Sequence, residues 1–398
     1  MSDVVVIGAG HVGVTLLTDL VSTQETHGST FCLVPARNTN RQRIRDLCGP
    51  FTRTNMMTGH VDMVRLGAPH LGHLDDGVLE AARHIIITVP DIPAVRLPLI
   101  DRIARLSSLP GKVVTIVQAG QGGQPVLADW VRRTPQLRDS SLILIEDSFY
   151  GTRVTGRDIA YKRKLTVNVT AYSRTPETAL DRLRGLFPLG HHIDQPSWPH
   201  FVARDGIGLL FDALGYIIHV GVALDRRNLD KTRAGITYRH YTEGVHPDLA
   251  VLLDALDRER VQLAAAYGTE TPTFPRIIER QYGIAFRPDF YDMMQACADI
   301  YRSMSCASIT ELMRSRFIRE DLPGLRTVQW LAKTAGVRLP VTERFASDVT
   351  RTAVELGAAA GDVNGYEPQL TAIPATVPHI KALLTDPHHA NLAEAAKR

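Results

Sequence analysis

Hydrophobic residues in the first half of the chain form short, uninterrupted runs. They cover residues 4–7, 31–34, 84–89, 113–117, 142–145 and 165–169. Runs of this length are typical of strands buried on both faces of a sheet, and the segments between them have a helical pattern. Alternating strands and helices at this spacing predict an α/β domain with a doubly wound parallel sheet.

The pattern changes near residue 200, after which we expect only helices. The clearest helix begins after His246, has Pro247 in its first turn and ends at Gly268, with leucines recurring along one face. Further helices are expected at 208–224, 290–302, 324–336, 341–356 and 389–397. The segment from Gly361 onward is rich in Pro, Ala and His, and we expect most of it to pack loosely. The sequence thus predicts two domains, residues 1–200 and residues 201–398.

Composition narrows the classes of function. A chain of 398 residues is long for one hydrophobic core, in agreement with two domains. Its 45 basic and 42 acidic residues are scattered, so nothing indicates a nucleic-acid or membrane partner. No signal sequence and no run of about 18 apolar residues is evident. We therefore expect a cytoplasmic protein with small-molecule partners.

No metal site or disulfide framework is indicated. The four cysteines contain no CxxC pair, which favours reduced thiols. His191 and His192 lie near Asp194 and His200, but their spacing matches no known ligand pattern, and a solvated loop is the simpler interpretation.

A glycine-rich turn follows the first strand and opens the first helix. Its residues are Gly8, Ala9, Gly10, His11, Val12 and Gly13. In this GxGxxG context the first glycine permits a tight turn, the second leaves room for a pyrophosphate, and the third allows close packing of helix on strand. The backbone amides of the helix start, at His11 and Val12, would face the phosphates. The turn predicts a Rossmann-type dinucleotide site, and the alternative is a glycine turn without a ligand.

The residues after the second strand bear on which nicotinamide cofactor binds. An NAD site has an acidic residue there, but this chain has Arg37, Asn38 and Arg41. A guanidinium can bind a 2′-phosphate at two points, so NADPH is favoured over NADH, with Arg37 the main contact. Alternatively, these arginines only solvate a surface turn. Val89 and Pro90, and the glycine-rich loop 118–123, are expected beside the nicotinamide because ligands lie beyond the carboxyl ends of parallel strands.

The second half contains three motifs in a fixed order. Asp257, Glu259 and Arg260 come first, then Arg316, Phe317, Glu320, Asp321 and Pro323, then Gly336, Val337 and Pro340. This order and spacing resemble the carboxyl-terminal domain of opine dehydrogenases of the octopine and nopaline type. Phe317 stands where that family has tyrosine. The family's Asn-Pro-x-x-His segment corresponds to residues 215–219, where His219 is kept and the Asn-Pro is lost.

The resemblance implies a reaction and roles for several residues. An opine dehydrogenase joins an amino acid or amine to a 2-keto acid by reducing the imine between them. His219 would move protons, Asp321 would fix its imidazole, and Arg316 would bind a substrate carboxylate. Residues 35–44 and 148–154 also resemble the enzymes that complete opine metallophores, and Tyr150 and Arg153 are further substrate-side candidates. A homodimer is expected, as in many dehydrogenases.

Simpler interpretations remain open. His219 could be a satisfied core histidine, and Arg316 and Asp321 an ordinary ion pair. The rival functions are a 2-keto or hydroxy acid dehydrogenase with no amine partner, and a redox sensor that binds NADPH without turnover.

Overall fold

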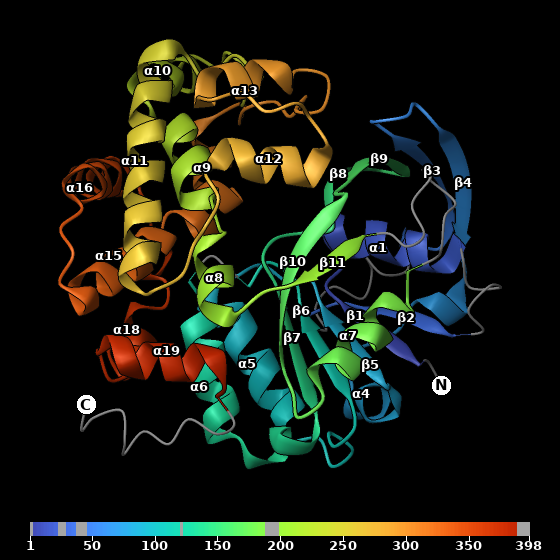
Figure 1. Ribbon diagram of the computed structural model, residues 1–398. Helices are drawn as coiled ribbons and strands as arrows, with labels where there is room; N and C mark the ends of the chain where they lie inside the picture. Colours follow the sequence, from blue (N-terminus) through green and yellow to red (C-terminus); the bar gives the residue numbers. More distant parts are fainter. Residues whose placement is uncertain (1–2, 23–28, 37–45, 120–121, 188–198, 388–398) are drawn as a thin grey trace. The chain divides into compact units, whose positions relative to one another are not determined.

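The computed structural model describes residues 3–22, 29–36, 46–119, 122–187 and 199–387 (Figure 1). Its contacts divide the chain into two compact units. The first, here called the α/β unit, comprises residues 1–90, 94–119 and 131–204. The second, the helical unit, comprises 205–398 together with 91–93 and 120–130. Two segments of the first half therefore belong with the second half, whereas the sequence predicts a single boundary at residue 200.

The main sheet of the α/β unit has seven strands. In spatial order they are β11 (His200–Ala203), β10 (Thr166–Tyr172), β7 (Ser141–Ile145), β6 (Val113–Ile116), β5 (His84–Ile87), β1 (Val4–Ile7) and β2 (Phe31–Val34). The strands from β2 to β7 run parallel, as predicted. β10 runs antiparallel to β7 and pairs in parallel with β11, so the sheet is mixed at this edge. The expectation that strands end before residue 200 was wrong by this one short strand.

Helices accompany these strands in the doubly wound manner. They are α1 (His11–Ser22), α4 (Asp76–Ala81), α5 (Pro93–Ala104) and α7 (Pro176–Arg184), with 3-10 turns at Ala68–His70 and Pro135–Asp139. A further helix, α6 (Gln124–Arg133), follows β6 in the chain, and its residues up to Trp130 belong to the helical unit. The strands β1, β2, β5 and β6 are buried along their whole length, which explains their uninterrupted apolar sequence.

A second sheet of four strands was not predicted. Its order is β4 (Val61–Leu66), β3 (Gly49–Asn55), β9 (Asp158–Arg163) and β8 (Tyr150–Thr155). Two hairpins about a hundred residues apart in sequence meet where β3 pairs in parallel with β9. The buried face of β3 carries Arg53 and Asn55 beside Phe51. Polar residues on the buried face conceal the alternation by which a strand of this kind is normally recognised.

A buried ion cluster holds the second sheet against α1. Asp19 accepts hydrogen bonds from Arg53 (2.8 Å), Arg163 (2.6 Å) and the hydroxyl of Tyr150 (2.6 Å). Burial alone would raise the pKa of Asp19, but the charges of Arg163 and Arg53 outweigh it and lower the pKa. Arg53 also pairs with Asp62. Removing one partner would leave an uncompensated buried charge, a change that typically costs about 3–5 kcal/mol.

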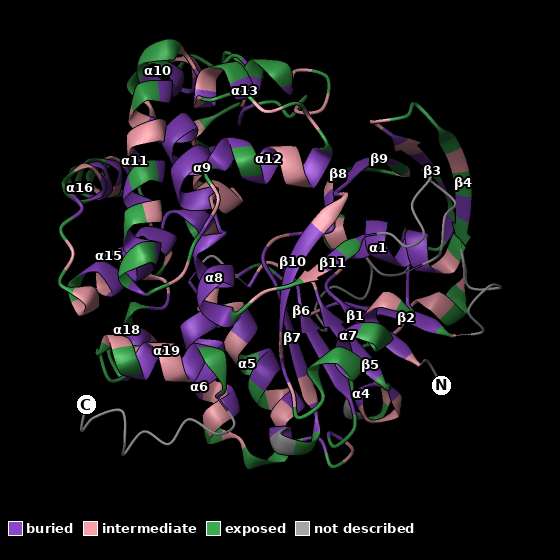
Figure 2. Ribbon diagram, viewed as in Figure 1, coloured by how far each residue is buried: buried purple, intermediate pink, exposed green. Residues whose placement is uncertain are grey.

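The helical unit is built around α9. Its elements are α8 (Gly206–Phe211), α9 (Gly215–Leu224), α10 (Arg226–Arg233), α11 (Pro247–Ala266), α12 (Phe274–Tyr282), α13 (Phe290–Ala296), α14 (Ile309–Arg314), a π-helix η4 (Phe317–Asp321), α15 (Gly324–Ala335), α16 (Pro340–Glu355), α17 (Ala360–Asn364), α18 (Glu367–Leu370) and α19 (Val377–Thr385). α9 is almost wholly buried (Figure 2) and packs against α11, α16, α15 and η4. The helices predicted at 324–336 and 341–356 are found within a residue, whereas the one predicted at 290–302 ends at Ala296.

The first of the three motifs in this half is structural. Glu259 accepts hydrogen bonds from the backbone N–H groups of Val341 and Thr342, at 2.9 and 2.7 Å, which satisfies the start of α16. Arg260 is fully buried and pairs with Asp257. It also donates to the carbonyl oxygen of Phe211, the last residue of α8, and to that of Pro272, shortly before α12. The motif therefore joins α11 to its neighbours.

Two expectations about this unit need correction. The segment Gly206–Leu224 is long and apolar enough by composition to cross a membrane, although no such run was expected. It is 89% buried within the protein and includes Asp212, both of which are ordinary for a core segment. The tail was expected to pack loosely, yet Tyr366, Leu370 and Leu383 are at most 4% exposed. The helix expected at 389–397 lies outside the described residues.

Candidate active site

The glycine turn has the geometry that a dinucleotide site requires. Gly8 has φ +121°, and a Cβ there would lie 2.7 Å from the hydroxyl of Thr88. A Cβ on Gly13 would lie 1.8 Å from the carbonyl oxygen of Gly8. Gly10 differs, because a Cβ there would meet no described atom within 4 Å. The fold itself demands glycine at 8 and 13, whereas the open space at Gly10, before the amino end of α1, is a cradle for a phosphate.

The strand ends beside this turn are fixed by a residue that the sequence did not single out. Arg96 is fully buried and donates to the carbonyls of Val89 (3.0 Å), Val117 (3.2 Å) and Gln118 (3.1 Å). Gln118 has φ +59°, a conformation that side chains other than glycine seldom adopt. Arg96 thereby orients the edge formed by Val89 and Pro90, where the nicotinamide half was expected.

Several predicted ligand-binding residues are not supported in the same way. Arg37, Asn38 and Arg41 lie outside the described residues, so the preference for NADPH stays a prediction. The hydroxyl of Tyr150 is committed to Asp19, as described above, and the side chain is 3% exposed. It is a structural residue, and its assignment to the substrate was wrong.

Arg153 lies on the opposite face of β8 from the residues that meet α1. On this strand Thr152 contacts Thr15 of α1 through their hydroxyls (2.7 Å), so the side chain of Arg153, one residue further, points the other way. Arg153 is exposed and has no described contact that links it to the glycine turn. His11, at the start of α1, accepts the N–H of Val154 through Nδ1 at 3.0 Å. Its other nitrogen, Nε2, therefore carries the proton in the neutral ring.

In the helical unit the structure brings together the three residues that carry the predicted chemistry. His219 lies on α9, and its Nδ1 is 2.8 Å from Oδ2 of Asp321, the last residue of the π-helix η4. Arg316, directly before η4, donates from Nε to Oδ2 (3.3 Å) and from a terminal nitrogen to Oδ1 (3.4 Å) of the same carboxylate. π-helical turns are rare and occur most often at functional sites.

The electrostatics of Asp321 determine the tautomer of His219. Burial would raise the pKa of Asp321, but the charges of Arg316 and His219 outweigh it and lower the pKa. Asp321 is therefore a carboxylate that only accepts hydrogen bonds, and Nδ1 of His219 donates to it. Nε2 is left as the nitrogen through which His219 can exchange a proton. This nitrogen lies 2.8 Å from the hydroxyl of Tyr241, a residue that sequence reasoning missed.

Aromatic rings enclose this dyad. Phe317 stacks on His219 with centroids 5.2 Å apart and on His240 at 4.5 Å. His240 is 1% exposed, and neither of its ring nitrogens has a hydrogen-bond partner among the described residues. Burial lowers the pKa of His240 to about 3, so its imidazole is neutral. No motif in the sequence marked His240 or Tyr241, because they lie on a loop between helices.

The neighbours of Asp321 connect the π-helix to the segments 91–93 and 120–130. Glu320 accepts the N–H of Asp91 at 3.1 Å. The buried carboxylate of Asp91 in turn accepts the hydroxyl of Tyr366 (2.6 Å) and, more distantly, the N–H of Gly123 (3.4 Å). Arg319 faces away toward Asp362, 3.4 Å distant. Glu320, to which the sequence assigned no role, thus holds the segment at Asp91, whereas Arg319 contacts α17.

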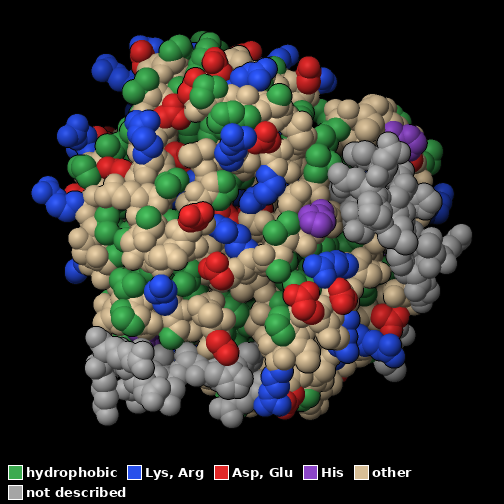
Figure 3. All heavy atoms as spheres, in the orientation of Figure 1, with side chains coloured by type: hydrophobic (Ala, Val, Ile, Leu, Met, Phe, Trp, Pro, Cys, Tyr) green, Lys and Arg blue, Asp and Glu red, His purple; other side chains and the backbone are tan. Residues whose placement is uncertain are grey.

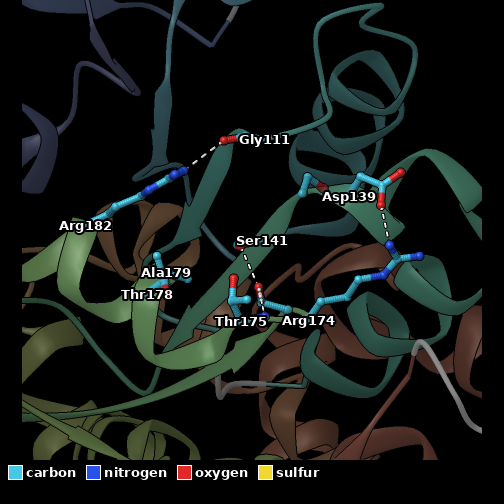
Figure 4. Close-up of a pocket in the computed structure, with 10 residues that line it drawn as sticks. Gly111, Asp139, Ser141, Arg174, Thr175, Thr178, Ala179 and Arg182 are labelled. Carbon is cyan, nitrogen blue, oxygen red and sulfur yellow. Dashed lines mark hydrogen bonds and ion pairs between the residues drawn. The ribbon is translucent and has the colours of Figure 1, made fainter.

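A cavity of about 230 Å³ lies elsewhere in the α/β unit (Figure 4). It is lined by Gly111, Ser141 and the start of α7, with Arg174 paired to Asp139 at its rim. Gly111 and Ser141 stand at the amino ends of β6 and β7, whereas dinucleotides bind beyond the carboxyl ends. This cavity is therefore separate from the glycine turn.

The described residues contain no group of three or more side chains suited to hold a metal ion. His191, His192 and Asp194 lie outside them, and His200 is an exposed residue at the start of β11. On the face shown in Figure 3, basic and acidic side chains are intermingled, as the near balance of charges in the sequence suggests.

Comparison with known proteins relates most of the helical unit to one family model. Residues 202–348 match the family model of the α-helical domain of NAD/NADP octopine/nopaline dehydrogenases. The helical unit therefore resembles the domain that this family model describes. The match covers His219, Tyr241, Arg316 and Asp321. No protein of curated function matches the sequence.

Solved structures of opine dehydrogenases share the fold of the whole chain. An octopine dehydrogenase in complex with NADH and agmatine has a TM-score of 0.70 at 16% identity, covering 97% of this chain and 98% of its own. An NADP⁺-bound yersinopine dehydrogenase has a TM-score of 0.68 at 14% identity, with coverages of 96% and 99%. A dimeric ketopantoate reductase from Staphylococcus aureus is less similar, with a TM-score of 0.52 at 12% identity and coverages of 89% and 99%. At these identities the likeness is one of fold.

Proposed function

We propose that the protein is an opine dehydrogenase, a nicotinamide-dependent oxidoreductase that joins an amino acid or amine to a 2-keto acid by reducing their imine. The observation that carries this proposal is the contact of His219 with Asp321 and of Asp321 with Arg316, inside the family's helical domain. These residues come from segments about a hundred positions apart. A chance ion pair at a helix end would not include an imidazole with a defined proton-exchange nitrogen.

The dyad is suited to the proton transfers of imine formation. When amine adds to a keto acid, the carbinolamine must lose water, which requires a proton on its hydroxyl oxygen. Protonated His219 can supply that proton, while Asp321 stabilises the imidazolium and keeps Nδ1–H directed toward itself. After reduction His219 can again exchange a proton with the product amine. General acid–base catalysis of this kind contributes typically about 10²–10⁴-fold to rate.

Arg316 is suited to bind the substrate carboxylate. Its guanidinium is planar, has five N–H donors and contacts Asp321, and its side chain is 34% exposed. A planar guanidinium can hold a carboxylate with two parallel hydrogen bonds, which would orient the keto acid beside His219. Octopine dehydrogenase has been solved with agmatine, with L-arginine and with pyruvate, which supports amines and keto acids as the substrate classes.

The cofactor would be held by the glycine turn. The open position at Gly10 and the amide groups at the start of α1 fit a pyrophosphate, and bound nicotinamide would supply the hydride. The octopine relative was solved with NADH and the yersinopine relative with NADP⁺. The preference for NADPH rests on Arg37, Asn38 and Arg41 in the sequence. A cytoplasmic location, a homodimer and a role in metallophore synthesis are further proposals that rest on the sequence.

A substrate matrix tests the function. NADPH and NADH oxidation would be measured with pyruvate, 2-oxoglutarate and oxaloacetate, each with and without a panel of amino acids and amines. We expect oxidation that depends on both partners and favours NADPH. Keto acid reduction that is indifferent to amine would replace the proposal with a hydroxy acid dehydrogenase. Cofactor binding without oxidation under any combination would favour a sensor.

A further inference from the structure

The hydroxyl of Tyr241 is hydrogen-bonded to Nε2 of His219, the nitrogen through which the imidazole can exchange a proton. Because Asp321 is a carboxylate, Nδ1 of neutral His219 donates to it and Nε2 has only a lone pair to offer. The hydroxyl of Tyr241, 2.8 Å away, must then be the donor to Nε2. Three side chains thus form one directed chain of hydrogen bonds, from Tyr241 through His219 to Asp321.

The phenol ring is held in place on several sides. The ring of Tyr241 packs against Tyr301 with centroids 4.5 Å apart and meets the edge of His240 at 4.9 Å. The residue is partly exposed, whereas Asp321 at the other end of the chain is fully buried. The hydrogen-bond chain therefore leads from the buried carboxylate outward, and Tyr241 is its outermost member.

We propose that Tyr241 is a catalytic residue that passes the proton between His219 and the substrate. The proposal rests on the opine dehydrogenase function. As the C–O bond of the carbinolamine breaks, the Tyr241 hydroxyl gives its proton to the departing oxygen, which leaves as water. The phenol oxygen takes the proton from Nε2 of protonated His219. His219 returns to the neutral form with Nδ1–H on Asp321, so one proton moves from His219 to the substrate and the phenol is unchanged.

The competing possibility is that substrate displaces the hydroxyl and contacts Nε2 directly. Tyr241 would then only cap His219 in the free enzyme. The two cases differ in what happens when the hydroxyl is removed and the ring is kept. If Tyr241 relays the proton, removing its hydroxyl removes the proton donor and slows the reaction. If substrate displaces the hydroxyl, removing it leaves the reaction unaffected.

The test compares Tyr241→Phe with Tyr301→Phe in the full-length protein. Both substitutions remove one phenol hydroxyl from the same aromatic cluster, but only Tyr241 contacts His219. With the best keto acid and amine pair, we expect kcat of Tyr241→Phe to fall at least ~100-fold while KM for each substrate changes less than about threefold. Tyr301→Phe should stay within about threefold of the parent. A Tyr241→Phe enzyme that keeps kcat within about fivefold would overturn the relay.

A second measurement separates the relay from a structural role. Fluorinated tyrosines placed at position 241 keep the ring and the hydroxyl but make the phenol more acidic. In a relay log kcat changes steadily with the acidity of the phenol, and a structural hydroxyl gives no such dependence. A parent enzyme without amine-dependent activity would refute the proposed function instead, so the two failures are distinguishable.

Discussion

The buried imidazole of His240 allows a quantitative prediction of how the free energy of unfolding depends on pH. This imidazole is fully buried, its nitrogens have no hydrogen-bond partner in the described part of the chain, and burial lowers its pKa to about 3. In the unfolded chain a histidine has a pKa near 6.5. Between these values the unfolded state binds a proton that the folded state does not. Stability must therefore be lost as the pH falls below about 6.5.

The magnitude follows from the two pKa values. At pH 5 the proton stabilises the unfolded chain by RT ln(1 + 10^1.5), about 2 kcal/mol, and at pH 8 the same quantity is close to zero. Replacing His240 with leucine removes this difference. We expect the loss of unfolding free energy between pH 8 and pH 5 to be about 2 kcal/mol smaller in His240→Leu than in the parent. Any loss of packing against Phe317 is common to both pH values and cancels.

The assay is urea denaturation followed by tryptophan fluorescence at both pH values. Trp130 and Trp330 belong to the helical unit, whereas the third tryptophan, Trp198, belongs to the α/β unit. Trp198 is therefore replaced with phenylalanine in the parent and in every variant, so that the fluorescence change reports the unit that contains His240. His84→Leu serves as a matched control, because burial lowers the pKa of His84 to about 3 as well but His84 lies in the α/β unit. It should leave the transition of the helical unit unchanged. Equal pH dependence in His240→Leu and the parent, within about 0.5 kcal/mol, would refute the argument that His240 stays neutral.

Three further predictions concern the site. Asp321→Asn should lower kcat by about 10²-fold or more, since the imidazolium of His219 loses its charge partner; a profile of kcat against pH that is unchanged in shape and height would contradict this. Gly10→Ala should leave the melting temperature near that of the parent, because the added Cβ meets nothing within 4 Å, yet weaken NADPH binding measured by calorimetry. Unaltered affinity would argue against a phosphate there. Tyr366→Phe removes a buried donor from the carboxylate of Asp91 and should lower the unfolding free energy by about 1–3 kcal/mol in chemical denaturation. A cost near zero would mean that water replaces the hydroxyl.

The pair formed by His219 and Asp321 shows how far sequence reasoning could go. The resemblance to opine dehydrogenases singles out His219, Arg316 and Asp321, and the structure joins these three side chains by hydrogen bonds. Tyr241 was not assigned, because it belongs to no motif and lies on the loop between α10 and α11. Its place beside Nε2 depends on how that loop folds back over α9, which no local pattern encodes.

The assignment of Tyr150 to the substrate side failed for a related reason. A short segment that resembles other opine enzymes suggests a substrate role for Tyr150. Its hydroxyl instead donates a hydrogen bond to Asp19, which is 131 positions away in sequence. That buried ion cluster also concealed the second sheet, because charged residues on an inward face break the usual alternation of strands. Arg96 is also not recognisable from the sequence, because a charged residue in a helix is normally exposed and its partners are backbone carbonyls of other segments.

The sequence by itself determined the local elements and the turn chemistry of this protein. The apolar strands, the helices capped by proline and glycine, and the glycine turn depend on backbone conformation and on burial patterns that repeat within a few residues. Only the tertiary structure decided the second sheet, the antiparallel edge, the assignment of residues 91–93 and 120–130 to the helical unit, and the chain of hydrogen bonds from Tyr241 to Asp321. The second sheet, the segment at Asp91 and the chain of hydrogen bonds depend on polar side chains that find partners far away in sequence. Such partners are selected by the cost of burying an unsatisfied group, which acts only once the chain has folded.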